Sequence, residues 1–343
     1  MRGNEIAMYN SFKANLAASL VFIIAVVSIY TYFYHIPHPG DDFGDETRYL
    51  IVKRGESLGE IADNLTRLGA ITSKTSFVVF GTLFGNASKM KTGRYAVKPS
   101  YSISDIMGIV SRGEATPYNV TIPEGYTLME IGRILQTTIG LDIDDFENET
   151  GETSILDSLG IEADNLEGYL APNTYNFFYE ENADKVVGKM TGYFFSSLPD
   201  SFEVKANKLG LTFQEAVTLA SLIEKEAMVD SERPLVASVF LNRLRKRMRL
   251  ECDPTVIYAM GGLDRRLLRK DLKYDSPYNT YRVYGLPPGP ISNPGYESLE
   301  AAVSPSDANY LYFVARGDGT HAFSYTLREH INATNRIKRG QPG

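Results

Sequence analysis

The stretch FQEAVTLASLIEKEA, residues 213–227, decides how the C-terminal part of the chain folds. Thr212 and Glu215 form a capping-box pattern at its start, which predicts a helix over these residues. Alanine, valine, leucine and isoleucine occupy nearly all sides of this helix. A helix that is apolar all round is buried inside a domain. The stretch therefore predicts a central helix around which the rest of the domain packs.

Two carboxylates, Glu224 and Glu226, lie at the C-terminal end of this helix. Burial raises the pKa of a carboxyl group, and the negative end of the helix dipole acts in the same direction. A glutamate that stays protonated near neutral pH is what a general acid needs. The alternative is an exposed last turn, with Lys225 between the two acids. Periodicity does not choose between the acids, because Glu224 continues the stripe of Val217 and Glu226 lies on the side of Leu222.

The segments that follow predict a second helix, ordered loops and a hairpin. Residues 231–248 read as a helix with Ser231 as its cap and Pro234 in its first turn. Its basic C-terminal end is either a solvated helix end or a groove for an anionic polymer. Residues 278–295 are rich in Pro, Gly, Asn and Tyr, which favours an ordered loop, and residues 310–330 read as a β-hairpin.

Residues 14–34 near the N-terminus form an apolar run without a charge. A helix of this length rises about 31 Å, which is enough to cross a bilayer core. Arg2 and Lys13 precede the run and acidic residues at 41–46 follow it, so the positive-inside rule predicts a cytoplasmic N-terminus. A cleaved signal peptide is the alternative.

The first part after this run, residues 48–62, predicts a strand, a glycine turn and a helix capped by Ser57 with Glu60. Residues 120–132 repeat the same spacing, with Thr127 in the capping position. The segment from 52 to 62, VKRGESLGEIA, resembles the opening of a LysM module, a small β-α-α-β unit that binds peptidoglycan glycans.

The composition excludes several classes of protein. The chain has 343 residues, 22% of them charged and 43% hydrophobic, which is typical of globular domains. The net charge of −7 disfavours sequence-independent nucleic-acid binding. One cysteine, Cys252, excludes internal disulfides and thiolate zinc clusters, and four histidines disfavour a metal site. We expect no metal and no cofactor.

Several motifs in order resemble the YceG-like family, the endolytic murein transglycosylases, over residues 48–337. They are EGYLAPNTY (167–175), ASLIEKEA (220–227), ASVFLNRL (237–244), DPTVIYAMG (253–261), YNTY (278–281), GLPPGPISNPG (285–295) and YFVARGDGTHAFS (312–324). The resemblance implies that the second Glu of the E-K-E motif, Glu226, is catalytic, and we keep Glu224 as the fallback. The family often has Thr after this Glu, where the present chain has Ala227.

The resemblance, together with polar and aromatic residue type, also suggests substrate-binding residues. Asn279, Tyr281 and the loop at 286–294 are candidates for the wall of a cleft, and Glu224 is a further candidate for substrate binding. Asn173 and Tyr175 are further candidates, although core packing is the alternative for the tyrosine and for its aromatic neighbours.

The expected architecture is an α+β protein with one N-terminal transmembrane helix, a small LysM-like module and a mixed α+β catalytic domain whose buried helix carries the catalytic Glu. The expected parts are a cytoplasmic N-terminus (1–13), the membrane helix (14–34), a linker (35–47), the LysM-like domain (48–113) and the catalytic domain (114–340).

The resemblance implies a lytic transglycosylase, held by a single-pass anchor in the bacterial cytoplasmic membrane with its catalytic domain outside. It would cut the MurNAc-β-1,4-GlcNAc bond of peptidoglycan to leave 1,6-anhydroMurNAc ends and so terminate nascent strands. The implied partners are peptidoglycan strands, the membrane and wall-synthesis enzymes such as penicillin-binding proteins, but no nucleic acid. The alternative is a non-catalytic, membrane-tethered peptidoglycan-binding scaffold.

Overall fold

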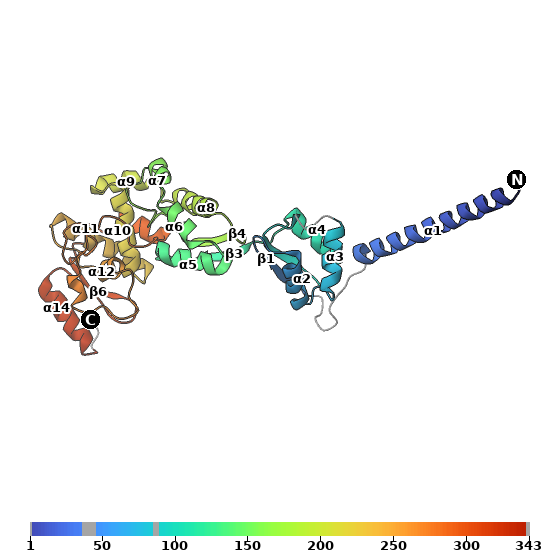
Figure 1. The fold of residues 1–343 in the computed structure, drawn as a ribbon. Coiled ribbons are helices and arrows are strands. Elements are labelled where there is room, and N and C mark those ends of the chain that lie inside the picture. The colour runs from blue at the N-terminus through green and yellow to red at the C-terminus, as the bar shows by residue number, and fades with distance from the viewer. Residues whose placement is uncertain (1, 36–45, 85–88, 341–343) are drawn as a thin grey trace. The chain divides into compact units, whose positions relative to one another are not determined.

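The computed structural model describes residues 2–35, 46–84 and 89–340 of the chain (Figure 1). The described residues contain runs of helices and separate two-stranded sheets, so the α+β class expected from the sequence is confirmed. The chain divides into two compact units, Met1–Tyr118 with Phe178–Glu180, and Asn119–Phe177 with Glu181–Gly343. Most of the predicted linker at 35–47 lies outside the described residues.

The first unit contains α1 (Arg2–His35), β1 (Arg48–Val52), α2 (Leu58–Arg67), α3 (Lys74–Leu83), β2 (Gly93–Val97) and α4 (Ile103–Arg112). The second unit contains α5 (Leu128–Ile139), α6 (Ile143–Thr150), α7 (Thr153–Leu159), β4 (Asn173–Phe177), α8 (Ala183–Ser196), α9 (Phe202–Leu209), α10 (Phe213–Glu226), α11 (Arg233–Arg245), α12 (Asp253–Ala259), α13 (Tyr296–Val303), β5 (Tyr312–Ala315), β6 (His321–Ser324) and α14 (Leu327–Lys338). β3 (Tyr118–Ile122) begins at the boundary and pairs with β4.

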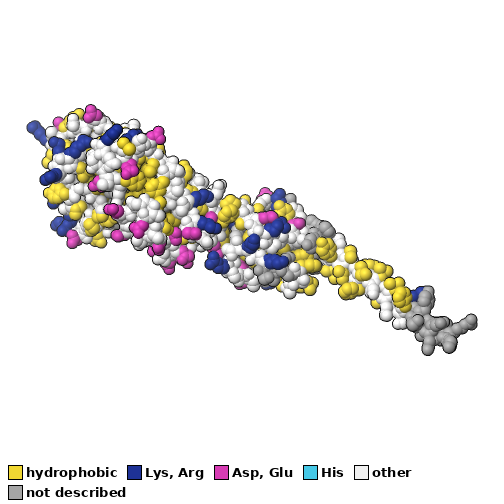
Figure 2. All heavy atoms as spheres, turned by 90° about the horizontal axis from the view of Figure 1, so that it is seen from above, with side chains coloured by type: hydrophobic (Ala, Val, Ile, Leu, Met, Phe, Trp, Pro, Cys, Tyr) yellow, Lys and Arg dark blue, Asp and Glu magenta, His cyan; other side chains and the backbone are white. Residues whose placement is uncertain are grey.

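Helix α1 includes the apolar run predicted from the sequence. Its segment Ser11–Tyr32 has 22 residues and a mean hydropathy of 2.1, so it is long and apolar enough to cross a membrane. Figure 2 shows hydrophobic side chains along this exposed helix. By length and composition, α1 is therefore suited to be a membrane anchor.

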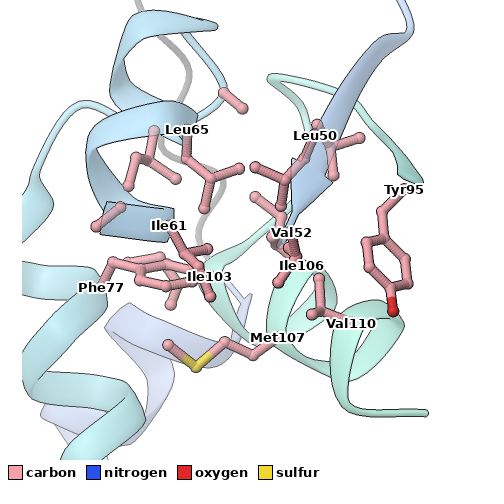
Figure 3. Packing of buried hydrophobic residues seen from close by; sticks show 14 of the residues in the cluster. Leu50, Val52, Ile61, Leu65, Phe77, Tyr95, Ile103, Ile106, Met107 and Val110 are labelled. Atoms are coloured by element: carbon pink, nitrogen blue, oxygen red, sulfur yellow. The ribbon is translucent and has the colours of Figure 1, made fainter. Parts of the chain in front are cut away.

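The rest of the first unit is a two-stranded sheet covered by three short helices. β1 and β2 are antiparallel, with Leu50 opposite Tyr95. Buried side chains from both strands and from α2, α3 and α4 form one core cluster, shown in Figure 3. The predicted capping box is present, because the Ser57 side chain accepts a hydrogen bond from the Glu60 N–H and Glu60 bonds back to Ser57. The predicted strand-turn-helix order of residues 48–62 is confirmed.

The second unit is built around α10, as the apolar stretch in the sequence predicts. All eight residues from 216 to 223 are buried, and α10 packs against α9, α11, α12 and α13. Each large aliphatic side chain buried here stabilises the fold by about 1.5–3 kcal/mol. Thr212 and Glu215 form the predicted capping box at the start of the helix. The helix ends at Glu226, because Ala227 adopts extended backbone angles.

The structure confirms one prediction for the segments after α10 and corrects another. The predicted hairpin is present as β5 and β6, which are antiparallel with Phe313 opposite Phe323. Ser231 does not cap the next helix. Residues 230–232 form a 3-10 turn instead, and α11 begins at Arg233. The turn holds Asp230 close enough to accept a hydrogen bond from the Arg233 Nε at 3.0 Å.

Two of the motifs meet at a position that requires glycine. Gly168, in EGYLAPNTY, has a φ of +89°, and a Cβ placed there would collide with the ring of Pro290. Asn293 joins the same two motifs, because its Oδ1 accepts hydrogen bonds from the N–H groups of Gly168 and Leu170 at 3.0 and 2.8 Å. These contacts fix the 285–295 loop against the start of the 167–175 motif.

Candidate active site

Glu226 is the last residue of α10, and its side chain is partly buried at the edge of a pocket. Its pKa is raised to about 7, mainly by burial; a hydrogen bond from Cys252 lowers the pKa, and the nearby negative charge of Asp253 adds to the increase. A pKa in this range keeps both the protonated and the ionised form of Glu226 populated at neutral pH. The side chain can both donate a proton and, once ionised, accept one.

Cys252 supplies a hydrogen-bond donor to this carboxyl group. Its Sγ lies 3.2 Å from the Glu226 Oε1. Burial raises the pKa of the Cys252 thiol well above its ordinary value, so the sulfur keeps its proton at neutral pH. The backbone holds Cys252 in place, because its N–H donates to the Thr280 Oγ1 at 3.0 Å. Since Ala227 offers no side-chain hydroxyl, Cys252 is the side chain that directs the carboxyl group here.

The pocket beside Glu226 has a volume of about 290 Å³. It combines a carboxylate-rich rim with one arginine, two histidines and the apolar side chains of β5. Its lining residues are Glu226, Arg243, Leu250, Glu251, Asp253, Tyr281, Phe313, Val314, Ala315, His321 and His330. The residues come from α10, α11, α12, α14, the 278–295 loop and the β5–β6 hairpin, so distant parts of the sequence build one site.

Tyr281 is the predicted cleft residue that the structure brings to Glu226. Its hydroxyl donates to the Asp253 Oδ1 at 2.6 Å, and both residues line the pocket. Asn279 lies behind it and is 0% exposed. The Asn279 side chain donates to the Leu272 and Tyr274 carbonyls, and its Oδ1 accepts from the Tyr281 N–H at 3.0 Å. Asn279 therefore shapes the loop that presents Tyr281.

Glu224 has a different environment from Glu226, although the two are two residues apart. Its Oε1 lies 3.2 Å from the Arg233 Nη1 in an ion pair whose side chains are only 6% and 7% exposed. Its Oε2 accepts a hydrogen bond from the Gly295 N–H at 2.9 Å. Glu224 is thus a buried, paired carboxylate that joins α10 to α11 and α13. Within the described ranges, no arginine or lysine forms such a pair with Glu226.

The structure does not bring Asn173 and Tyr175 to this pocket. Asn173 begins β4, where its Oδ1 accepts from the Thr174 N–H. Tyr175 is 4% exposed, its hydroxyl donates to the Ala171 carbonyl at 2.6 Å, and its ring stacks on Phe177. Tyr175 is therefore a core residue, the alternative given for it above, and its hydroxyl group is hydrogen-bonded inside the domain.

Sequence reasoning did not single out several residues that line the pocket. His321 is one of them, and its Nδ1 lies 2.7 Å from the Glu232 Oε2. Arg243, which belongs to the basic helix end noted in the sequence, also lines the pocket, with its Nε donating to the Leu311 carbonyl at 2.7 Å and its guanidinium group over the ring of Tyr312. Both residues belong to motifs quoted above, at 237–244 and 312–324. They come together in one pocket only because the β5–β6 hairpin packs against α11.

The sequence of the chain is similar to those of known proteins that share one family. The model of the YceG-like family matches residues 50–336. The endolytic murein transglycosylase of Bacillus subtilis is 35% identical over 299 residues, which cover 82% of each chain. The protein of the same name from Streptococcus pneumoniae is 29% identical over 327 residues, which cover 82% of the present chain and 58% of the pneumococcal one. The present chain thus spans less than two thirds of the pneumococcal relative.

A solved structure gives the same likeness in three dimensions. The 2.6 Å crystal structure of a YceG-like protein from Listeria monocytogenes aligns with a TM-score of 0.58 and 33% identity. The alignment covers 84% of the present chain and 99% of the Listeria chain. The likeness in sequence and the likeness in fold thus each extend over more than four fifths of the present chain.

Proposed function

The chain belongs to the YceG-like family, and on that premise we propose that it is a membrane-anchored endolytic lytic transglycosylase that cleaves the glycan strands of peptidoglycan. The observation that carries the proposal is the environment of Glu226. The carboxyl group has a pKa of about 7, has a thiol donor and opens onto a pocket. Its neighbour Glu224 is held in an ion pair with Arg233 instead.

In the proposed reaction, the protonated Glu226 gives its proton to the O4 of the leaving N-acetylglucosamine as the bond from C1 of N-acetylmuramic acid breaks. The 2-acetamido group of the muramic residue stabilises the positive charge that develops at C1. The C6 hydroxyl of the same sugar then attacks C1, and the ionised Glu226 takes its proton. The products are a free O4 end and a 1,6-anhydro end.

One carboxyl group suffices for this sequence of steps. A hydrolase generally needs a second carboxylate to activate water, whereas here the nucleophile belongs to the substrate and has a high effective concentration. Asp253 lies in the same pocket, but its Oδ1 accepts a hydrogen bond from the Tyr281 hydroxyl at 2.6 Å. We assign to Asp253 the role of keeping the Glu226 pKa high through its charge, and to Tyr281 the role of contacting the sugar.

The other parts of the chain fit the same proposal. Helix α1 would anchor the protein in the cytoplasmic membrane, with residues 1–13 inside and the catalytic unit (114–340) outside. Residues 48–113 would form the LysM-like module, supported by the β1, α2, α3 and β2 order in the first unit. Cleavage beside wall-synthesis enzymes such as penicillin-binding proteins would terminate nascent strands, and co-purification from crosslinked membranes tests that partnership.

The full-length protein in detergent, incubated with purified sacculi in oxygen-18 water, is expected to release fragments with 1,6-anhydroMurNAc ends that carry no heavy oxygen. The reason is that the attacking oxygen comes from C6 of the sugar and not from solvent. Mass spectrometry of the fragments measures this directly. Reducing muramyl ends that carry oxygen-18 would instead assign a hydrolase, and no cleavage at all would favour the tethered scaffold.

Cys252→Ala is expected to lower the cleavage rate and to move the alkaline limb of the pH–rate profile to higher pH. The rate of the wild type falls as the pH rises through about 7, because Glu226 must be protonated to act as an acid. The Cys252 hydrogen bond lowers the pKa of Glu226, so its loss raises that pKa. Cys252→Ser keeps a donor and is expected to keep the wild-type limb. An unchanged limb in Cys252→Ala would remove Cys252 from the proton chemistry.

A further inference from the structure

A second, larger pocket lies in the same unit as Glu226. Its volume is about 780 Å³. It is bounded by α5, α6 and α12, by the end of α10 and by Ile291 of the 285–295 loop. The apolar side chains that line it are Leu128, Met129, Ile143, Phe146, Pro254, Ile257, Ala259 and Ile291. The proposed chemistry at Glu226 makes no use of this space, which we call the apolar pocket.

The apolar pocket and the Glu226 pocket use consecutive residues of the chain. Lys225 lines the apolar pocket and Glu226 lines the other. At the start of α12, Pro254 lines the apolar pocket and Asp253 lines the Glu226 pocket. Consecutive Cα atoms are about 3.8 Å apart, so the two pockets adjoin at two points of the backbone. The two pockets therefore border the same two short stretches of backbone, at the end of α10 and at the start of α12.

The charges around the apolar pocket have both signs. Glu130 and Glu147 bring carboxylates to its lining, and Lys225 brings an ammonium group. The Lys225 Nζ donates one hydrogen bond, to the Gly125 carbonyl at 3.0 Å, and an ammonium group has three donors. Glu167 adds little charge at neutral pH, because burial raises its pKa to about 8. The Leu128 N–H and the Asn293 side chain donate to it at 3.2 and 3.0 Å.

The two aromatic rings of the lining already pack inside the unit. Phe146 is 1% exposed. The ring of Tyr258 packs against that of Tyr278, with centroids 5.1 Å apart. The open surface of the pocket is therefore aliphatic with charges at its border, which suits a short charged peptide with small apolar side chains better than a glycan.

We propose that the apolar pocket binds the stem peptide of the muramic residue that is cleaved at Glu226. This inference rests on the proposed function, because peptidoglycan carries such a peptide on the lactyl group of each muramic acid before trimming. The alanine methyl groups of the stem face the aliphatic lining, its carboxylates face Lys225, and the ammonium group of its diamino acid faces Glu130 and Glu147. An extended tetrapeptide spans roughly 14 Å, which is enough to enter the adjoining pocket.

The test compares two forms of one substrate. Uncrosslinked, peptide-bearing glycan strands are cleaved by the full-length protein before and after treatment with an amidase that removes the stems. We expect the wild type to cleave the peptide-bearing strands with a kcat/KM about tenfold higher, which corresponds to about 1.4 kcal/mol of binding. Equal values on the two substrates would overturn the inference and leave the proposed function standing. Cleavage of neither would overturn both.

Two variants test the pocket itself, each with a matched control. Met129→Trp fills the space, and Glu147→Lys reverses a charge on the exposed surface of α6. Both are expected to bring kcat/KM on peptide-bearing strands down to the value for stripped strands. Val204→Trp and Glu203→Lys make the same changes on α9, outside the pocket and at exposed positions, and are expected to keep the wild-type ratio. A wild-type ratio in both pocket variants would refute stem binding there.

Discussion

Glu226→Gln is expected to reduce glycan cleavage by about 10²–10⁴-fold while the protein stays folded. Glutamine has nearly the shape of glutamic acid, but it has no acidic proton to give to the leaving O4. It can still accept the hydrogen bond from Cys252, whose Sγ lies 3.2 Å from the Glu226 Oε1. Release of fragments from sacculi measures the loss, and circular dichroism shows whether the helices remain. Wild-type cleavage by the folded variant would remove Glu226 from the mechanism.

The same variant is expected to be at least as stable as the wild type, with the largest difference above pH 7. The pKa of Glu226 is raised from 4.5 to about 7 in the folded state, so the folded protein binds the proton more tightly than the unfolded chain. Its stability therefore falls as the pH rises from about 4.5 to 7, by up to about 3 kcal/mol, and then levels off. The neutral glutamine avoids this loss. Thermal unfolding at pH 5 and pH 8 separates the two cases.

Glu224→Gln is expected to show the opposite pattern, a large loss of stability with catalysis retained by the molecules that fold. The change removes the charge that faces Arg233 in an ion pair with side chains 6% and 7% exposed. Breaking such a buried pair costs about 3–5 kcal/mol, because the arginine charge stays buried and keeps only Asp230, which is 71% exposed, as an acidic partner. For a domain of this size that corresponds to a melting temperature lower by roughly 6–20 °C. Differential scanning fluorimetry measures the loss.

A double variant controls for failure to fold. Replacing both partners, Glu224→Met with Arg233→Met, leaves no unpaired charge between them and is expected to recover part of the lost stability. Cleavage per folded molecule by either variant should stay close to wild type. If Glu224→Gln folds normally and loses cleavage, while Glu226→Gln keeps it, the proton donor is two residues away from the assignment made here.

The sequence predicts the elements whose causes are local. The capping box of Thr212 and Glu215 and the apolar residues that follow specify α10. Glycines at the turn specify the β5–β6 hairpin, in which Phe313 faces Phe323. The cap of α11 is missed because Arg233 forms hydrogen bonds with Asp230 and Ser298, and the second of these partners lies far along the chain. Long-range partners of this kind leave no periodic pattern in the sequence.

Contacts between residues distant in the sequence also explain why the candidate site is predicted only in part. Composition and periodicity indicate two acids at the end of a buried helix but do not distinguish them. Their environments differ through partners distant in sequence, Gly295 and Arg233 for Glu224 but Cys252 for Glu226. Residue type alone does not show whether Asn279 binds substrate or supports the fold. In the structure its side-chain amide donates to the Leu272 and Tyr274 carbonyls, and the residue is 0% exposed.

The most direct test of the account is the titration of the Glu226 side chain in the full-length protein. Carbon-13 NMR of the glutamate carboxyl groups, with Glu226→Gln to assign the signal, gives the midpoint. We predict a midpoint near pH 7, because burial favours the protonated form. A midpoint near 4.5, the ordinary value for glutamate, would mean that the group is ionised at neutral pH and is not the proton donor.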